Sequence, residues 1–300
     1  MSSPLVSVII NCYNGEKYLR EAIDSVYAQT YKNWEIIFWD NASIDSTPLI
    51  ANSYDSKLRY FRSDKNLKLY SARNHALKKC KGEFIALLDS DDVWLKEKLE
   101  LQIPVFDDMQ IGLVYSNSVV LYDSGRERVK NKSKLLPEGM IFSNLLVNYC
   151  IDINTVVIRK KLIDDHGLVF LDSLNITGDL LFFLKVSYVS KVKPIRLVLA
   201  KWRNHGSNLS VIKADLLSNE LKISILDLIK SYPEIIYTYE AEILRFITNI
   251  YIQESKYYLL NGRTKLVKER LSNRKFRSIK IFILWLLSYD FLSFLIKYIG

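Results

Sequence analysis

The sequence predicts an α/β fold, a mainly parallel, doubly wound sheet flanked by helices, and two observations support this prediction. Apolar runs rich in β-branched residues alternate with stretches of helical spacing along residues 5–89. Polar side chains follow these runs where the predicted strands end. In such sheets ligands bind beyond the carboxyl ends of the strands, so the same pattern predicts the position of a site.

Each predicted element follows from its local residue pattern. Continuous β-branched or aromatic runs predict four buried strands, at residues 5–10, 34–40, 58–63 and 84–89. Three helices are predicted between them, at residues 14–30, from Thr47-Pro48 onward, and at 69–82, where Gly82 ends the helix. Later in the chain, residues 174–191 predict an amphipathic helix and residues 195–202 a strand.

Composition limits the protein to a few classes. In 300 residues, 49% hydrophobic and 25% charged content is ample for a globular core. The three cysteines (Cys12, Cys80 and Cys150) are widely spaced without a CxxC pair, which argues against a disulfide framework or a zinc site. There is no basic region before the short N-terminal apolar run and no uncharged run that could span a bilayer. The sequence therefore predicts a cytoplasmic protein.

The C-terminal part differs from the rest in charge and pattern. We predict one domain at residues 1–210 and a helical appendage at 211–300. Between Lys256 and Lys280 there are nine Lys and Arg residues but one acid, and an apolar stretch with few charges follows. A basic flank beside such a stretch predicts peripheral binding to the anionic inner face of the cell membrane. Packing against the protein's own helices is the alternative.

Three carboxylates in four positions follow the fourth predicted strand, at Asp89, Asp91 and Asp92. Like charges this close raise one another's pKa unless a cation or strong donors compensate. One aspartate is enough to cap the next helix, and we assign Asp92 to that role, at the start of a helix predicted over residues 93–102. The remaining D-x-D pair predicts a bound divalent cation.

Several common ligand loops do not fit the sequence. The segment "NCYNGEKY" after the first strand contains neither GxGxxG nor GxxxxGK[ST], which argues against nicotinamide and Walker-type nucleotide binding. A calcium loop starting at Asp89 is rejected, because Val93 and Trp94 stand where an oxygen ligand and a glycine are required.

Four segments together resemble family 2 glycosyltransferases of the GT-A fold, a Rossmann-like, mainly parallel sheet flanked by helices. They are "VSVIINCYN", "WDNASIDST", "NLKLYSARN" and "LLDSDDVW", and the resemblance covers about residues 4–210. It implies an inverting enzyme that moves a sugar from a nucleotide-sugar, most often a UDP-sugar, to a hydroxyl of a growing glycan. A lipid-linked acceptor of bacterial surface polysaccharide synthesis fits the C-terminal part. Asn41 and Lys68 depart from the family pattern, in which aspartate and glycine are frequent there.

The resemblance also implies roles on the donor side. Asp40 reads the ring N–H of the base, which suits an acceptor-only carboxylate, and Arg73 approaches the base or the phosphates. Asp89 lies near the ribose or the metal, and Asp91 binds Mn²⁺ or Mg²⁺. The other residues expected in donor binding are Asn11, Tyr13, Ser90 and Arg203.

On the acceptor side, "GDLLFFLKVS" resembles the acidic motif of the family, and this makes Asp179 the expected general base. Gly178 stands where glutamate is commoner. The segment "KWRNHGSNLS" resembles a Y-R-x-H motif with Trp202 in place of tyrosine, which implies that His205 contacts the metal or the diphosphate.

Two other functions are weighed against this one. A sugar nucleotidyltransferase has a similar sheet but requires a loop rich in glycine and arginine after the first strand, which is absent. A nucleic-acid-binding protein is suggested by the basic segment. However, its aromatic residues do not alternate with basic ones, and the acidic strand ends would repel phosphates without a metal. We therefore expect no nucleic-acid partner.

Overall fold

The computed structural model describes residues 3–131 and 136–260, and the chain divides into two units, Met1–Ile212 and Lys213–Gly300. The prediction of a membrane-binding segment rests mainly on residues 261–300, which lie outside the described residues. Within residues 3–131 and 136–260, no helix is long and apolar enough to cross a membrane.

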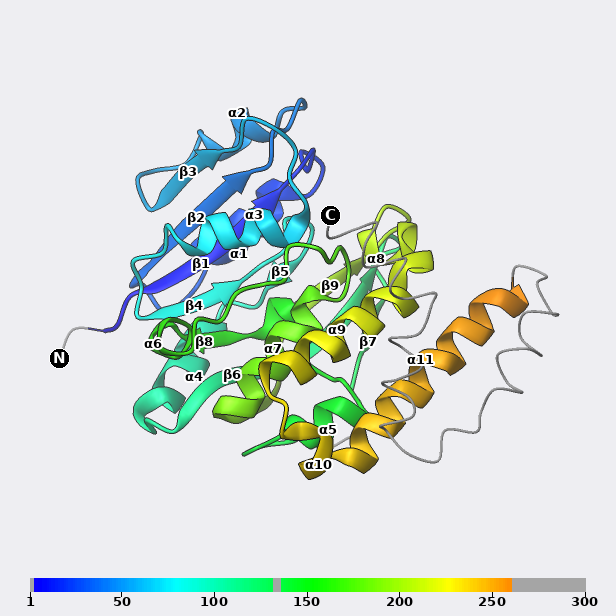
Figure 1. The fold of residues 1–300 in the computed structure, drawn as a ribbon. Coiled ribbons are helices and arrows are strands. Elements are labelled where there is room, and N and C mark those ends of the chain that lie inside the picture. The colour runs from blue at the N-terminus through cyan, green and yellow to red at the C-terminus, as the bar shows by residue number, and fades with distance from the viewer. Residues whose placement is uncertain (1–2, 132–135, 261–300) are drawn as a thin grey trace. The chain divides into compact units, whose positions relative to one another are not determined.

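The first part of the chain forms a parallel half-sheet, as predicted (Figure 1). Its strands are β1 (Val6–Cys12), β2 (Trp34–Asp40), β3 (Leu58–Arg62) and β4 (Phe84–Leu87). They lie in the order β3-β2-β1-β4, every neighbouring pair is parallel, and the connecting helices are α1 (Leu19–Tyr27), α2 (Thr47–Ala51) and α3 (Leu69–Leu77). Because Cys12 pairs with Asp40 in the register, the carboxyl ends of β1 and β2 lie side by side.

The rest of the first unit extends this sheet with mixed strand directions. Its strands are β5 (Val93–Trp94), β6 (Ile111–Tyr122), β7 (Glu127–Val129), β8 (Val157–Arg159) and β9 (Lys191–Asn204). Strand β8 runs antiparallel to both β4 and β6, whereas β9 runs parallel to β6. The sheet is therefore parallel only up to β4 and mixed beyond it.

Short helices surround this second half of the sheet. They are α4 (Lys98–Gln102), α5 (Phe142–Val147), α6 (Lys160–Asp165), α7 (Gly178–Val189) and α8 (Leu209–Ile212), with 3₁₀ turns η1 (Ile103–Asp107) and η2 (Ile153–Thr155). Helix α7 begins at Gly178, and this places Asp179 in its first turn.

The second unit is helical over its described residues, which confirms the predicted helical region. It contains η3 (Ala214–Leu216), α9 (Leu217–Ser231), α10 (Ile235–Thr238) and α11 (Glu240–Leu260). Helices α9 and α11 are joined by a buried ion pair in which Lys222 Nζ lies 3.2 Å from Glu254 Oε1.

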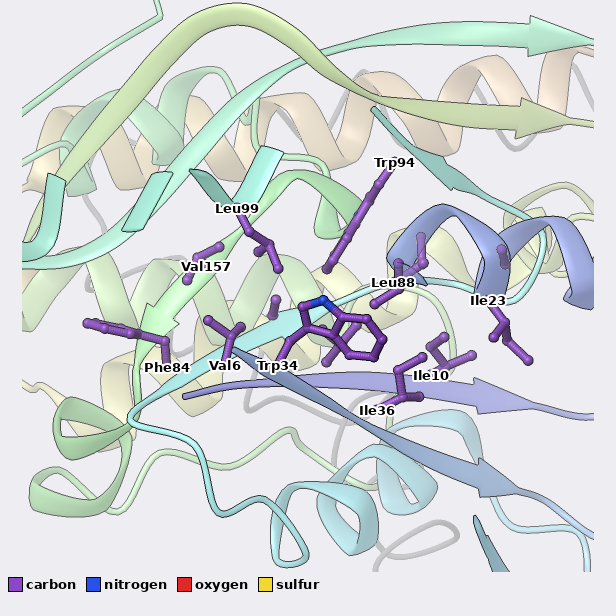
Figure 2. Packing of buried hydrophobic residues seen from close by; sticks show 14 of the residues in the cluster. Val6, Ile10, Ile23, Trp34, Ile36, Phe84, Leu88, Trp94, Leu99 and Val157 are labelled. Carbon is purple, nitrogen blue, oxygen red and sulfur yellow. The ribbon is translucent and has the colours of Figure 1, made fainter. Parts of the chain in front are cut away.

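The main core lies between the parallel strands and the segments that cover them (Figure 2). Alternate residues of β1 and β2 point into it and meet Ile23 of α1, Trp94 of β5 and Val157 of β8. Burial of each such side chain contributes about 1.5–3 kcal/mol. This packing holds the strand ends in fixed positions, which a site built on them requires.

Two local expectations are wrong. Helix α3 ends at Leu77 with Lys78 as its C-cap, so Gly82 does not end it. Instead, Gly82 allows the segment before β4 to approach β1 closely, because a Cβ there would lie 2.6 Å from the backbone nitrogen of Ser7. The helix predicted over residues 93–102 is also shorter: β5 occupies its first residues, and α4 begins at Lys98.

Candidate functional site

The loops after β1 and β2 form one hydrogen-bonded edge at the carboxyl ends of the parallel strands. The backbone N–H of Asn14 donates to Ser43 Oγ at 3.0 Å, and that of Gly15 donates to Thr47 Oγ1 at 2.9 Å. Asn14 has a φ of 52°, in the left-handed region that asparagine tolerates better than most residues. Gly15 has no room for a side chain, since a Cβ there would lie 2.4 Å from Cys12 Sγ. The backbone of the loop after β1 is therefore held in place by side chains of the loop after β2.

Asp40 lies at the end of β2, where the sequence places it, but its carboxylate is fully covered. The backbone N–H of Ser43 donates to Oδ1 at 2.8 Å. The hydroxyl of Tyr60 and Nη1 of Arg62 each donate to Oδ2 at 2.6 Å. For a base to reach Asp40, the Arg62 side chain or the loop at Ser43 has to move aside.

Asn41 has a structural reason to be an amide in this chain. Its Nδ2 donates to the Leu67 carbonyl and to Asn66 Oδ1, both at 2.8 Å, while its Oδ1 accepts the Leu67 backbone N–H at 3.0 Å. A carboxylate is acceptor-only and could not donate the first two bonds. Asn41 thereby ties the segment before α3 to the end of β2.

Asn11 is the clearest unsatisfied group at this edge. Both polar atoms of its side-chain amide are buried and have no hydrogen-bond partner among the described residues. An unpaired buried donor or acceptor costs about 1–3 kcal/mol, so Asn11 is a candidate to contact a bound molecule. Tyr13, two residues on, is 48% exposed at the same edge. Ser90 also lies here, with its Oγ 3.4 Å from where a Cβ of Gly15 would stand.

Arg73 and Asp89 form a salt bridge in the middle of the site. Helix α3 carries Arg73, which is 4% exposed, and its Nη2 donates to Asp89 Oδ1. Burial alone would lower the pKa of Arg73, but the nearby carboxylates, Asp89 above all, outweigh it and hold that pKa above its ordinary value. The guanidinium therefore stays charged. It is held 5.3 Å from the ring centre of Tyr70 and 5.9 Å from that of Phe170.

Asp179, in the first turn of α7, lies close to this salt bridge. The hydroxyl of Tyr70 donates to its Oδ1 at 3.2 Å. Burial raises the pKa of Asp179 above its ordinary value, Arg73 opposes this, and Asp89 adds to it. A carboxyl with a raised pKa is a stronger base than an exposed aspartate, which suits proton abstraction.

Asp91 and His205, far apart in the sequence, meet near Asp89. His205 Nε2 lies 2.9 Å from Asp91 Oδ2. The backbone N–H of Ser207 donates to Nδ1 at 3.3 Å, so in the neutral ring Nε2 carries the hydrogen and donates it to Asp91. The ring of Tyr18 stacks on His205 with centroids 5.2 Å apart. Burial and the charge of Asp89 raise the pKa of Asp91, and His205 opposes them.

The Asp91–His205 pair fits a metal that is also held by a substrate. Among the described residues, no group of three His, Cys, Asp or Glu side chains could hold an ion unaided. Once the ring hydrogen moves from Nε2 to Nδ1, so that the hydrogen bond between the two side chains is given up, the pair offers one carboxylate oxygen and one imidazole nitrogen, and Mn²⁺ accepts both kinds of ligand. Mg²⁺ and Mn²⁺ commonly take one or two protein ligands and complete their shell with phosphate oxygens and waters.

Arg203 and Asp92 hold the metal-side segments together. The backbone N–H of Arg203 donates to Asp92 Oδ1 at 2.8 Å, and Asn154 Nδ2 donates to Asp92 Oδ2 at 2.7 Å. The interpretation of Asp92 as a helix cap is therefore wrong, because β5 follows it and its oxygens accept bonds from distant segments. The guanidinium of Arg203 is itself engaged, by the carbonyl of Asp91 and the carboxylate of Glu21. To contact a donor phosphate it has to exchange one of these partners.

The site includes residues that were not among those predicted from the sequence, notably Tyr18, Tyr60, Arg62 and Tyr70. Arg62 stands at the end of β3, and the rule that selected polar residues at the other strand ends would have found it. Tyr18 belongs to an apolar helical pattern and Tyr70 to a helix, so nothing in their local sequence separates them from core residues.

Comparison with known proteins gives consistent matches. The family model described as "Glycosyl transferase family 2" matches residues 7–166, just over half of the chain. The chain is 34% identical over 171 residues to the Escherichia coli protein named UDP-Glc:alpha-D-GlcNAc-diphosphoundecaprenol beta-1,3-glucosyltransferase WfgD, which covers 57% of this chain and 66% of that one. Across three curated relatives, the match spans 65–66% of the relative's length.

Two solved structures show the same fold. S. aureus TarS 1–349 in complex with UDP-GlcNAc has a TM-score of 0.66 and 21% identity, over 86% of this chain and 74% of that one. The mannosyltransferase PcManGT from Pyrobaculum calidifontis, in complex with GDP-Man and Mn²⁺, has a TM-score of 0.59 and 14% identity, over 90% and 85%. At these identities the likeness concerns the fold alone, and it confirms the predicted GT-A class.

Proposed function

Because the chain belongs to the family 2 glycosyltransferases, we propose that it is an inverting enzyme that transfers a sugar from a UDP-sugar to a hydroxyl of a growing glycan. The observation that carries the proposal is the arrangement around Arg73 and Asp89. A base candidate, Asp179, and the Asp91–His205 pair both lie near this salt bridge, since the charge of Asp89 raises the pKa of Asp179 and that of Asp91. A displacement reaction needs a base for the attacking hydroxyl and a positive charge for the departing diphosphate within one site.

The proposed reaction is one displacement at the anomeric carbon. The acceptor oxygen forms a bond to this carbon on one face while the bond from the carbon to the diphosphate oxygen breaks on the other, so the configuration inverts. Asp179 takes the proton of the acceptor hydroxyl, and UDP leaves with the electron pair of the broken bond. Arg73 pairs with Asp89, and its positive charge reduces the repulsion between this carboxylate and a phosphate-bearing substrate.

We propose that Asp91 and His205 hold the divalent cation, Mn²⁺ or Mg²⁺. When bound, such an ion stabilises the negative charge that develops on the departing diphosphate. Support comes from the mixed oxygen and nitrogen ligands of the pair and from PcManGT, whose structure contains GDP-Man and Mn²⁺.

The donor and acceptor classes are proposed from the relatives. WfgD is named for a UDP-Glc donor and a diphosphoundecaprenol-linked acceptor, and TarS 1–349 binds UDP-GlcNAc. We propose a UDP-sugar donor and a lipid-linked glycan acceptor, as in the synthesis of a bacterial surface polysaccharide. Asp40 is covered by Arg62, so the proposed contact with uracil needs the rearrangement at Arg62 described above.

Donor hydrolysis tests the proposed function. Purified protein is incubated with Mn²⁺ and with UDP-, GDP- or dTDP-sugars, and the released nucleotide is measured. We expect slow, metal-dependent release of UDP from one or more UDP-sugars, because water can replace the acceptor hydroxyl. Absence of release from every nucleotide-sugar would contradict the proposal. Release of pyrophosphate from UTP and a sugar 1-phosphate would indicate a nucleotidyltransferase instead.

We propose that the enzyme works at the inner face of the cell membrane, because a lipid-linked acceptor and the basic and apolar sequence of residues 256–300 both favour this location. Each Lys or Arg near an anionic surface contributes about 1 kcal/mol to binding, and salt weakens this contribution. We expect the full-length protein to co-sediment with anionic liposomes more strongly at low than at high salt. Equal recovery with neutral and anionic liposomes would argue against a role of the basic segment in membrane binding.

A further inference from the structure

Tyr70 and Gly178 fit against each other beside the candidate base. Tyr70 of α3 is 2% exposed, and its ring lies over the first residue of α7. A Cβ at Gly178 would stand 2.6 Å from both Cδ2 and Cε2 of this ring, closer than any carbon contact allows. The ring can therefore occupy its position only because residue 178 has no side chain.

The surroundings of Tyr70 leave its ring little freedom. Phe170 stacks on it with the ring centres 5.7 Å apart, and Phe170 in turn stacks on Phe182 of α7 at 4.2 Å. The guanidinium of Arg73 lies 5.3 Å from the centre of the same ring. Held in this way, the phenol presents its hydroxyl to Asp179 Oδ1 at 3.2 Å.

Tyr70 and Arg73 are three residues apart on α3, so their side chains lie on the same face, with Cβ atoms about 5–6 Å apart. The first contacts Asp179, and the second contacts Asp89. A single turn of one helix thus contacts both carboxylates, Asp179 through Tyr70 and Asp89 through Arg73.

We propose that Tyr70 is a positioning residue for Asp179: its hydroxyl binds Oδ1 and fixes the orientation of the carboxylate toward the acceptor hydroxyl, while Gly178 makes room for its ring. The inference rests on the proposed role of Asp179 as the base. It assigns a function to a residue of α3 that does not itself contact the reacting atoms.

Several charged or titratable groups face Asp179. They are Tyr70 and Arg73 of α3, Asp89 after β4, and Tyr149 between α5 and η2. Among them, the hydrogen bond from Tyr70 lowers the pKa of Asp179. Burial raises the pKa of Tyr70 itself well above 10, so its hydroxyl remains a donor through the neutral range. Loss of this hydroxyl should therefore raise the pKa of Asp179.

The test is Tyr70→Phe, which keeps the ring and removes only the hydroxyl. We expect kcat to fall about tenfold, which is the change in rate that the loss of one hydrogen bond to a charged group produces. The affinity for UDP should be unchanged, because the lost bond lies on the acceptor side. A base acts only when deprotonated, so the acid limb of the profile of kcat/KM against pH should move to higher pH. A ¹³C carboxyl titration of Asp179, assigned with Asp179→Asn, should show the same upward shift without reference to activity.

Two further variants make the result decisive. Tyr115→Phe is the matched control: it removes the hydroxyl of another buried tyrosine, which donates to the Pro137 carbonyl at 2.8 Å, and it should move neither kcat nor the acid limb. Gly178→Ala keeps both functional groups but displaces the ring, and we expect it to lower kcat as well.

The outcomes separate the two claims. An unchanged acid limb and an unchanged Asp179 titration in Tyr70→Phe would overturn the positioning role, whatever the reaction is. Full activity of Asp179→Asn would overturn the base assignment on which that role rests. A shift in both measurements together with normal behaviour of Tyr115→Phe would support it.

Discussion

Asp179→Asn is expected to lower turnover by about 10²–10⁴-fold while UDP binding stays close to that of the unaltered protein. Asparagine has nearly the same size and shape, so α7 should keep its start and the Tyr70 hydroxyl can still donate to the side-chain oxygen. The amide cannot accept the proton of an acceptor hydroxyl. The loss should therefore appear in kcat and spare the donor side, where Arg73 and Asp89 remain paired.

The pH dependence of the unaltered enzyme should report the same group. Burial raises the pKa of Asp179 above the ordinary aspartate value of 3.8. Activity should be complete above this raised pKa and decline as the pH falls through it, because the protonated carboxyl is not a base. Asp179→Asn should lose this acid limb from whatever activity remains.

An exposed aspartate supplies the control for the change in charge. Asp165, at the end of α6, pairs with Lys161 one turn earlier and has no other ion pair within residues 3–131 and 136–260, so Asp165→Asn should leave kcat, KM and UDP affinity unchanged. Turnover of Asp179→Asn equal to that of this control would remove Asp179 from the mechanism. Another acidic residue near the acceptor would then have to act as the general base.

The parallel half of the site could be predicted because it follows from strand order. Parallel strands that alternate with helices end at one edge, so Asn11, Asp40 and Asp89 had to lie near one another once the strands were recognised. Strand register, however, does not show which side chains bury a given residue. The burial of Asp40 under Tyr60 and Arg62 depends on how β3 pairs with β2.

The other half of the site depends on long-range pairing that local patterns do not encode. Asp91 meets His205 because β5 pairs with β9, with Val93 opposite Lys201. The same pairing brings the backbone of Arg203 to Asp92, so an aspartate that looks like a helix cap is instead the acceptor that joins separate segments. His205 was found only through the family resemblance. Tyr70 could not be found at all, since its role depends on the missing side chain of Gly178.

Asp91→Asn is expected to weaken Mn²⁺-dependent UDP binding and turnover together. A neutral amide is a poorer ligand for a hard cation than a carboxylate. Replacing even the outer-shell partners of a metal site costs about 10- to 100-fold in affinity or activity, so loss of a direct ligand should cost at least tenfold. Calorimetric titration of UDP with and without Mn²⁺ measures this, and the binding that remains without metal should be unchanged.

Asp107→Asn, at an exposed aspartate that ends η1, removes the same charge outside the site and should not alter the titration with Mn²⁺ or the titration without it.

The stronger test adds His205→Gln and the double variant. Two side chains that hold the same ion must depend on each other, as their 2.9 Å contact implies. Once Asp91→Asn has removed most of the metal binding, His205→Gln has little left to remove, so the double variant should lose much less than the product of the two single losses. Strictly multiplicative losses would mean that the two residues act separately, and unchanged affinity in Asp91→Asn would mean that the ion binds elsewhere.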